Sequence, residues 1–260
     1  MAKLVTLRTM RFVLTSILAA SPFFWAPMLD ARERPGPPRF ADDGASIRLA
    51  RALRAAGDSR AAIQIYRRLL SQRNAPPGLQ LELGETLMDA GMIDDAIGVF
   101  LAIPSDSPNA AEAQLGLARV QLELNKPSNA LEYIDRAASI AQNDVRILVL
   151  RGIILDCVGR HSEAQASYRA AMALAPRSVA VRNNLALSLV FTGQYKEAIG
   201  LLTPIARSVD ATAKERQNLA FVLGLSGDAS AALALSRVDL DEASAQANTR
   251  FFAFVNQKSR

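Results

Sequence analysis

A 34-residue period runs through most of this 260-residue chain. Steps of 34 from Gly193 reach only glycine or asparagine, the residue types that most readily adopt a positive φ. The same step from Ala198 always reaches alanine, and from Ala186 it reaches alanine or glycine. The three series are Gly57, Gly91, Asn125, Gly159, Gly193 and Gly227; Ala62, Ala96, Ala130, Ala164, Ala198 and Ala232; and Ala50, Gly84, Ala118, Gly152, Ala186 and Ala220. They predict six helix pairs that turn at the glycine or asparagine and pack closely through small residues.

Apolar side chains surround these small residues at helical spacing, as in the series Leu49, Leu83, Leu117, Leu185 and Leu219. Arg151 and Gln121 depart from the apolar pattern. The period and pattern resemble the tetratricopeptide repeat, although the usual tryptophan of its first helix is absent. The resemblance implies an all-α fold, a right-handed α-solenoid of about six 34-residue helix-turn-helix repeats with a C-terminal capping helix.

The predicted array covers residues 43–244, with repeats starting near 43, 77, 111, 145, 179 and 213. Residues 31–42 hold three prolines and a glycine and are expected to form a linker. Asp94, Ser128, Ser162 and Ser230 share one register and are expected to cap the second helices. A last helix is expected over residues 241–256. Its phenylalanines, Phe251, Phe252 and Phe254, form either a hydrophobic lid or a docking site.

Residues 1–30 predict an N-terminal targeting segment. Lys3, Arg8 and Arg11 precede the apolar run that starts at Phe12, and small residues follow at Ala19 and Ala20. This pattern predicts export with cleavage to the periplasm or the periplasmic face of the envelope. The alternative is an uncleaved anchor, since no charge interrupts residues 12–29. Ser21 stands where a bacterial lipoprotein signal has its lipidated cysteine, so no thiol is available there.

Composition excludes several classes of function. The chain has one Cys and one His, which argues against a disulfide framework and a multi-ligand zinc site. Without the three basic residues of the N-terminal segment, 27 basic residues face 25 acidic ones, and no basic stripe with aromatics remains for nucleic acid. Cys157 has no neighbouring base, and His161 is expected to be solvated in a turn. We therefore expect no enzyme activity, cofactor or metal.

The first helices of such an array line a groove. Counting the turn glycine as position 15 of each repeat, groove-facing side chains fall near positions 2, 5, 6, 9 and 12. The predicted partner-binding residues are Leu81, Glu85, Met88, Leu115, Arg119, Leu122, Val149, Ile153, Asp156, Asn183, Asn184, Leu187, Val190, Gln217, Asn218 and Phe221. An apolar strip of this kind indicates a site for an amphipathic helix or an extended segment of a protein partner. Alternatively, curvature buries some of these residues against one another.

Asn184 and Asn218 lie one residue before a Leu-Ala pair in successive repeats. In many tetratricopeptide proteins, asparagines here bind the backbone of a peptide, because an amide both donates and accepts hydrogen bonds. Capping or solvation is the alternative. Leu187 and Asn184 are expected near the groove centre, and Leu187→Glu is expected to remove binding while the fold is kept.

The last third of the chain resembles the TadD proteins of the tight-adherence (Tad, or Flp) pilus assembly system. The resemblance covers roughly residues 180–250 and rests on RQNLA at residues 216–220, the Gly-Asp turn at 227–228, and Asp239-Leu240 followed by an asparagine-containing helix. It implies an exported, non-catalytic, pilotin-like accessory factor that helps an outer-membrane secretin assemble. Ser21 departs from the lipoprotein pattern of that family. The alternatives are a periplasmic scaffold in envelope or polysaccharide assembly, and a chaperone for secreted subunits.

Overall fold

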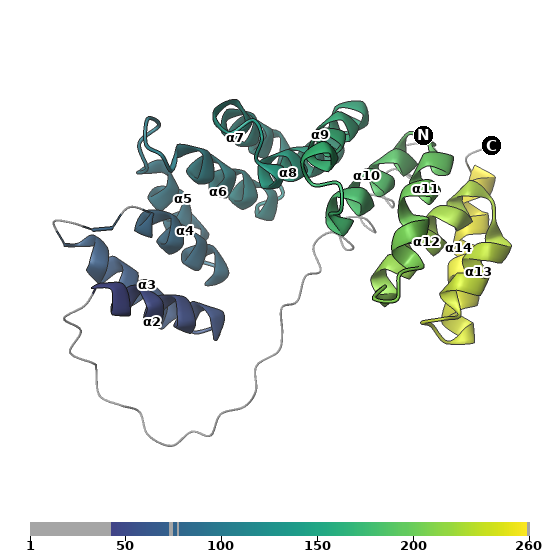
Figure 1. Cartoon of the computed structure of the whole chain (residues 1–260), viewed down its shortest axis with the longest axis horizontal. Helices are drawn as coiled ribbons and strands as arrows, with labels where there is room; N and C mark the ends of the chain where they lie inside the picture. Colours follow the sequence, from purple (N-terminus) through teal and green to yellow (C-terminus); the bar gives the residue numbers. More distant parts are fainter. Residues whose placement is uncertain (1–42, 73–74, 77, 259–260) are drawn as a thin grey trace, which may run out of the picture. The chain divides into compact units, whose positions relative to one another are not determined.

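The computed structural model describes residues 43–72, 75–76 and 78–258. The predicted targeting segment at 1–30 and the linker at 31–42 lie outside the described residues. The described chain divides into two compact units, residues 43–142 and residues 143–258. In both units the described secondary structure is helical and contains no strand, which confirms the predicted all-α fold class (Figure 1).

The first unit contains three helix pairs: α2 (Asp43–Ala55) with α3 (Ser59–Leu70), α4 (Leu79–Asp89) with α5 (Ile93–Leu101), and α6 (Ala110–Glu123) with α7 (Pro127–Ile140). The second unit contains α8 (Val145–Cys157) with α9 (His161–Leu174), α10 (Val179–Phe191) with α11 (Tyr195–Ala206), α12 (Ala213–Ser226) with α13 (Ala229–Ser236), and then α14 (Glu242–Lys258). The even-numbered helices from α2 to α12 are called first helices below and their partners second helices. Within each unit a second helix also contacts the first helix of the next pair.

The turns inside the pairs follow the glycine and asparagine series of the sequence. Gly57, Gly91, Gly159, Gly193 and Gly227 have φ between 72° and 99°. Among the described residues, Asn125 is the one non-glycine with positive φ, at 55°. The amide of the residue after each of these six donates to the carbonyl oxygen five residues earlier, as Gln194 does to Leu189 at 2.9 Å. This bond satisfies a carbonyl that the end of the first helix would otherwise leave free.

Small residues bring the helices of a pair together, as predicted. All six alanines of the second-helix series are 0% exposed. On the first helices, glycine makes room for an aromatic ring: a Cβ built at Gly84 would lie 2.5 Å from the ring of Phe100, and one at Gly152 would lie 2.5 Å from the ring of Tyr168. Phe100 also fills the space at Gly116, in the next pair. The rings therefore take the volume that a larger first-helix residue would need.

The predicted caps of the second helices are wrong. Asp94, Ser128, Ser162 and Ser230 lie inside the first turns, because each second helix begins about two residues after the positive-φ residue. The N-cap positions are Asp58, Met92, Lys126, Arg160, Gln194 and Asp228. Of these, the two aspartates accept hydrogen bonds from backbone amides, Asp58 from Ala61 and Asp228 from Ala231.

The two residues that break the apolar pattern have different surroundings. Gln121 on α6 is 8% exposed, and its Oε1 has no hydrogen-bond partner among the described residues. Arg151 on α8 is partly buried, and its Nη1 donates to Ser167 Oγ at 2.8 Å. A buried amide oxygen without a partner costs free energy, so the Gln121 position is less stabilising than the leucines of the other repeats.

Candidate partner-binding surface

The predicted groove residues all lie on first helices, but they belong to two units. Those on α4 and α6 are in the first unit, and those on α8, α10 and α12 are in the second. Nine are partly buried, namely Leu81, Glu85, Met88, Leu122, Val149, Ile153, Asn183, Asn184 and Gln217. Arg119 is exposed, and Asp156 is described below. Binding of a partner at these positions remains a prediction.

Five of the predicted positions are buried: Leu115, Leu187, Val190, Asn218 and Phe221 are between 2% and 8% exposed. The expectation that Leu187→Glu leaves the fold intact is therefore wrong, because Leu187 is only 2% exposed and glutamate there would place an unpaired charge in a buried position. Asn184, one turn earlier on α10 and partly buried, is a better position for a test of binding.

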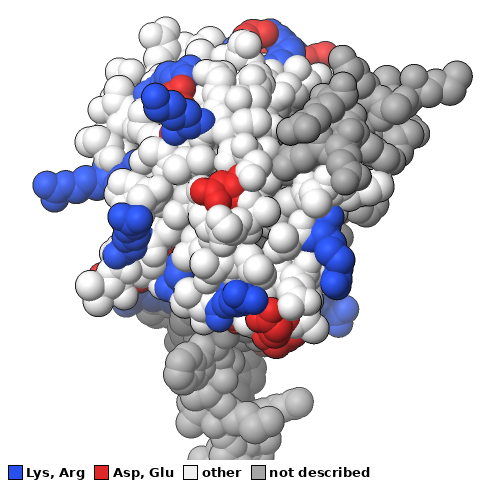
Figure 2. Space-filling model, turned by 90° about the vertical axis from the view of Figure 1, so that its right-hand side faces the viewer, with Lys and Arg blue, Asp and Glu red and all other residues white. Residues whose placement is uncertain are grey.

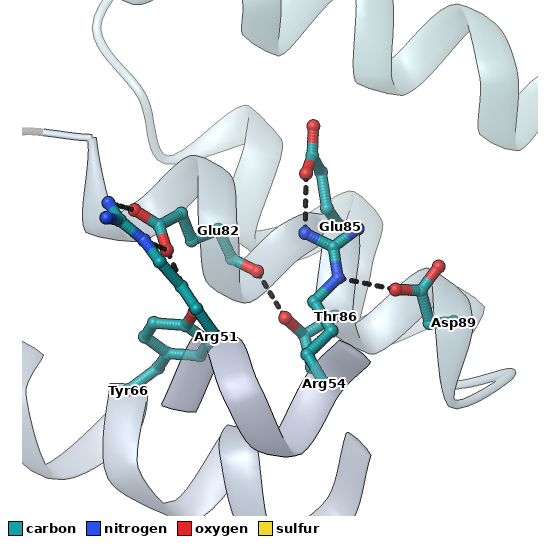
Figure 3. A network of polar contacts seen from close by, with 7 residues as sticks. All are labelled: Arg51, Arg54, Tyr66, Glu82, Glu85, Thr86 and Asp89. Carbon is teal, nitrogen blue, oxygen red and sulfur yellow. Dashed lines mark hydrogen bonds and ion pairs between the residues drawn. The ribbon is translucent and has the colours of Figure 1, made fainter. Parts of the chain in front are cut away.

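In the first unit the same face carries a network of ion pairs (Figure 3). Arg51 on α2 donates through Nε and Nη2 to Glu82 on α4, at 2.9 and 2.6 Å. Arg54 lies between two carboxylates of α4, 2.7 Å from Glu85 and 2.6 Å from Asp89. Two successive first helices are thus joined by charged side chains, where sequence analysis expected a mainly apolar strip.

Tyr66 on α3 connects this network to the core. It is 0% exposed, and its hydroxyl donates to Glu82 at 2.8 Å. The hydrogen bond from Arg51 lowers the pKa of Glu82, more than burial raises it. Burial, followed by the bond to Glu82, raises the pKa of Tyr66, so the phenol stays protonated and donates. Farther along the face, burial and the nearby Asp89 raise the pKa of Glu123.

Sequence analysis missed Arg51 and Arg54, although the period contained the signal. Arg51 lies one full repeat before Glu85, and Arg54 lies one full repeat before Met88, so both occupy the groove register. The predicted groove residues start at Leu81, in the second repeat, and include none from the first repeat. Arginine in one repeat and acid in the next is the arrangement that places opposite charges side by side on neighbouring helices.

In the second unit, a pair of amides connects two of the first helices, α10 and α12. Asn218 on α12 donates through Nδ2 to Asn183 Oδ1 on α10 at 2.7 Å. The donor group of Asn218 is therefore used between repeats, while Asn184 beside this pair is partly buried. Arg216 pairs with Asp239, which also accepts a bond from Gln217 at 3.4 Å. A peptide backbone placed here would meet both hydrogen-bond donors and hydrogen-bond acceptors of side-chain amides.

A buried polar cluster lies around Asp156, where α8, α9 and α10 meet. The carboxylate is 2.8 Å from His161 Nδ1, accepts from Ser188 Oγ at 2.9 Å and is hydrogen-bonded by Tyr168. His161 stacks on Phe191 with ring centroids 4.4 Å apart, and its side chain is 17% exposed, so the prediction of a solvated histidine is wrong. Burial raises the pKa of Asp156, although the three donors oppose this effect. The imidazole of His161 and the hydroxyls of Ser188 and Tyr168 all contact this one carboxylate, so the cluster connects α8, α9 and α10.

Two further properties bear on function. In the described part of the chain, no three His, Cys, Asp or Glu side chains converge where they could hold a metal ion. None of the helices from α2 to α14 is both long and apolar enough to cross a bilayer.

Comparison with known proteins identifies the repeats. A tetratricopeptide repeat family model matches residues 53–114, in the first unit, and a second matches residues 151–209, in the second. The chain is 28% identical over 115 residues to the uncharacterized protein y4yS of Sinorhizobium fredii, which covers 44% of this chain and 59% of that protein. It is 28% identical over 215 residues to cellulose synthase 1 operon protein C of Komagataeibacter xylinus, which covers 82% of this chain but 16% of that protein. The chain thus spans less than two thirds of the length of these relatives.

Solved structures show the same fold. A tetratricopeptide repeat protein from Parabacteroides merdae superposes with a TM-score of 0.57 at 13% identity, covering 81% of this chain and 84% of that one. The TTC0263 protein of Thermus thermophilus gives 0.53 at 21% identity, covering 70% and 99%. MamA of Desulfovibrio magneticus gives 0.55 at 19% identity, covering 65% and 97%. The chain therefore contains tetratricopeptide repeats, which generally mediate contacts between proteins.

Proposed function

We propose that this protein is a non-catalytic scaffold of the bacterial envelope that binds a protein partner through its first helices. The carrying observation is that within each unit the first helices present partly buried polar side chains, with amides in the second unit and ion pairs in the first. Such groups are desolvated enough to discriminate between partners and exposed enough to be reached. The described residues hold no cluster that could bind a metal for catalysis.

The assembly that this scaffold serves is proposed to be a Tad/Flp pilus, with the protein in a TadD-like, pilotin-like role toward an outer-membrane secretin. Support comes from the resemblance over residues 180–250 and from the tetratricopeptide repeat match at residues 151–209, which overlaps its first part. The targeting pattern of residues 1–30 supports an exported protein. A fusion of residues 1–42 to a reporter active only outside the cytoplasm should give signal; an intact but inactive fusion would contradict export.

The N-terminal segment should also stay unlipidated. Thioether attachment of a diacylglycerol needs a thiol, and Ser21 offers only a hydroxyl, a weaker nucleophile at neutral pH. Metabolic labelling with a fatty-acid probe should leave the wild type blank. A labelled wild-type protein would contradict this reading of the segment.

A scaffold for a polysaccharide-synthesising complex is the second candidate. The observation that favours it is the match to cellulose synthase 1 operon protein C, which covers 82% of this chain, a larger share than y4yS covers. Both candidates use the same surface and differ in the partner. The identity of the bound protein therefore decides between them.

Site-specific photocrosslinking in the native cell makes this decision. A photoreactive residue at Asn184, in the groove register of α10, is compared with one at Ala170, an exposed position on the second helix α9. A secretin or another pilus component crosslinked at Asn184 and not at Ala170 supports the pilus role. A polysaccharide synthase component supports the second candidate. Equal labelling from both positions would overturn the proposal that first helices bind the partner.

A piliation assay tests the same surface by function. Asn184→Arg, which places a bulky charge in the groove register, should reduce pilus assembly in a complemented deletion strain, with the protein level unchanged. Ala170→Arg adds the same side chain to the second helix and should complement like the wild type. Full piliation by Asn184→Arg would show that the binding surface lies elsewhere.

A further inference from the structure

The first helices α4 and α6 of the first unit contact each other and share an apolar strip. Leu81 and Met88 on α4 are partly buried and lie seven residues, or about two helical turns, apart. Leu115 and Leu122 occupy the same two positions of the next repeat on α6. Leu115 is 3% exposed, and Leu122 is partly buried. A strip of this kind is suited to the apolar side of an amphipathic segment.

Three carboxylates, those of Glu85, Asp89 and Glu123, lie at one end of this strip, which is called the acidic end. Arg54 donates to both Glu85 and Asp89, at 2.7 and 2.6 Å (Figure 3). Glu123 is close enough to Asp89 to feel its charge, and its side chain has no ion pair or hydrogen bond in the described part of the chain. Arg119, one turn earlier on α6, is exposed and does not pair with it. One bonded guanidinium therefore faces three carboxylates.

The acidic end is unfavourable for the fold itself. Asp89 and Glu123 are the last residues of α4 and α6, where the negative end of the helix dipole disfavours a carboxylate. Burial, and then the charge of Asp89, raises the pKa of Glu123. Residues that act against the local rules of stability are often functional. A cation supplied by a ligand would relieve both effects.

We propose that the first unit binds a basic amphipathic segment of the partner protein, an inference that rests on the scaffold function proposed above. Apolar side chains of the segment cover Leu81, Met88 and Leu122, and its lysine or arginine side chains meet the acidic end. Charge complementarity of this kind selects the partner and speeds association. The pattern differs on the side where α13 and α14 lie in Figure 1, since Figure 2 shows single charges there, separated by uncharged side chains.

Two model peptides test the charge of the segment on the purified full chain. Both are amphipathic helices of about 14 residues, or about four turns, one made of leucine and lysine and the other of leucine and glutamate. The lysine peptide should bind at least about tenfold more tightly at low salt. The difference should shrink at about 0.5 M salt, because exposed charges are then screened. Equal affinity for both peptides at low salt would overturn the proposal.

Two charge reversals show where the lysine peptide binds. Glu123→Lys should weaken its binding about fivefold or more. Glu132→Lys makes the same charge change at an exposed position of the second helix α7 and should bind like the wild type. Lysine suits the end of a helix better than glutamate, so Glu123→Lys should also melt about 1–4 °C above the wild type, which separates lost binding from lost folding. Weakening by both variants alike, or by neither, would overturn the proposal.

Photocrosslinking in the cell separates this proposal from the one on which it rests. A photoreactive residue at Arg119, exposed on α6, should capture the partner found from Asn184, through a segment that contains lysine or arginine. Exchange of those basic residues for glutamate should remove binding, and Glu123→Lys should restore part of it. A partner captured from Asn184 but not from Arg119, or captured there through an acidic or uncharged segment, would overturn this proposal and keep the scaffold function. A Glu123-dependent preference for the lysine peptide, with no partner captured from Asn184, would overturn the scaffold function alone.

Discussion

Gly152→Ala should destabilise the second unit, although alanine is the better helix former. Alanine in place of glycine inside a helix normally gains about 1 kcal/mol. Here the new Cβ would lie 2.5, 2.6 and 2.8 Å from three carbons of the Tyr168 ring. That ring is 1% exposed, and its hydroxyl is held by Asp156, so it has little room to move. Overpacking of a core costs about 1–3 kcal/mol.

The net loss should therefore be about 1 kcal/mol, because the steric cost exceeds the gain in propensity. In a unit of this size it lowers the melting temperature by a few degrees, about 4–8 °C per kcal/mol, measured by circular dichroism at 222 nm on the full chain. Gly200→Ala is the matched control: Gly200 lies inside α11 and an added Cβ meets nothing within 4 Å, so this variant should be more stable than the wild type. A Gly152→Ala protein as stable as the wild type would refute the argument that the ring sets the residue size.

Three further predictions concern single residues. Gly193→Ala should cost about 1 kcal/mol in unfolding free energy through backbone strain alone, since φ is 73° and no atom lies within 4 Å of the new Cβ; equilibrium urea unfolding checks this. Glu82→Gln should cost about 1 kcal/mol at pH 7, reduced by the exposure of Arg51. The difference from the wild type should shrink as pH falls below 4.5, because the stabilisation from a lowered pKa is lost between the unfolded and the folded pKa; a difference that does not shrink at all as the pH is lowered would contradict it. Asp156→Asn should become more stable relative to the wild type as pH rises from about 4 toward 7. The raised pKa of Asp156 means that the folded wild type binds this proton more tightly than the unfolded chain, so the wild type loses stability as the proton leaves, and the asparagine variant does not. A stability difference that stays constant across this range in thermal unfolding would rule out this prediction.

The repeat architecture could be predicted from the sequence because its signals are local and periodic. A positive φ needs glycine or asparagine, and a close helix contact needs a small residue, so both requirements appear at fixed steps in the chain. Helix starts were predicted less well, because serine and aspartate near a helix start can cap it or lie in its first turn. Asp228, two residues before Ser230, accepts the capping bond from the amide of Ala231, and Ser230 in the first turn donates its hydroxyl to Asp228.

The candidate site could be predicted only by register. The period places Asn184 and Leu187 on the same helix face, but it does not say which of them is buried, since this depends on what each side chain contacts in three dimensions. His161 illustrates the same limit: its partner Asp156 is close in sequence, yet the stacking ring of Phe191 comes from the end of α10, in the next repeat. Contacts of this kind are set by pairs of residues, and no single position carries the signal.

The ring of Phe100 lies against Gly84 of its own helix pair and also against Gly116 of the following one. A protein engineer who treats each repeat of the sequence as a separate module would therefore break the first unit at the wrong place. Replacing residues 111–142 by a repeat with alanine at the position of Gly116 would place a Cβ 2.6 Å from this ring. The exchangeable piece is a second helix together with both of the first helices that enclose it.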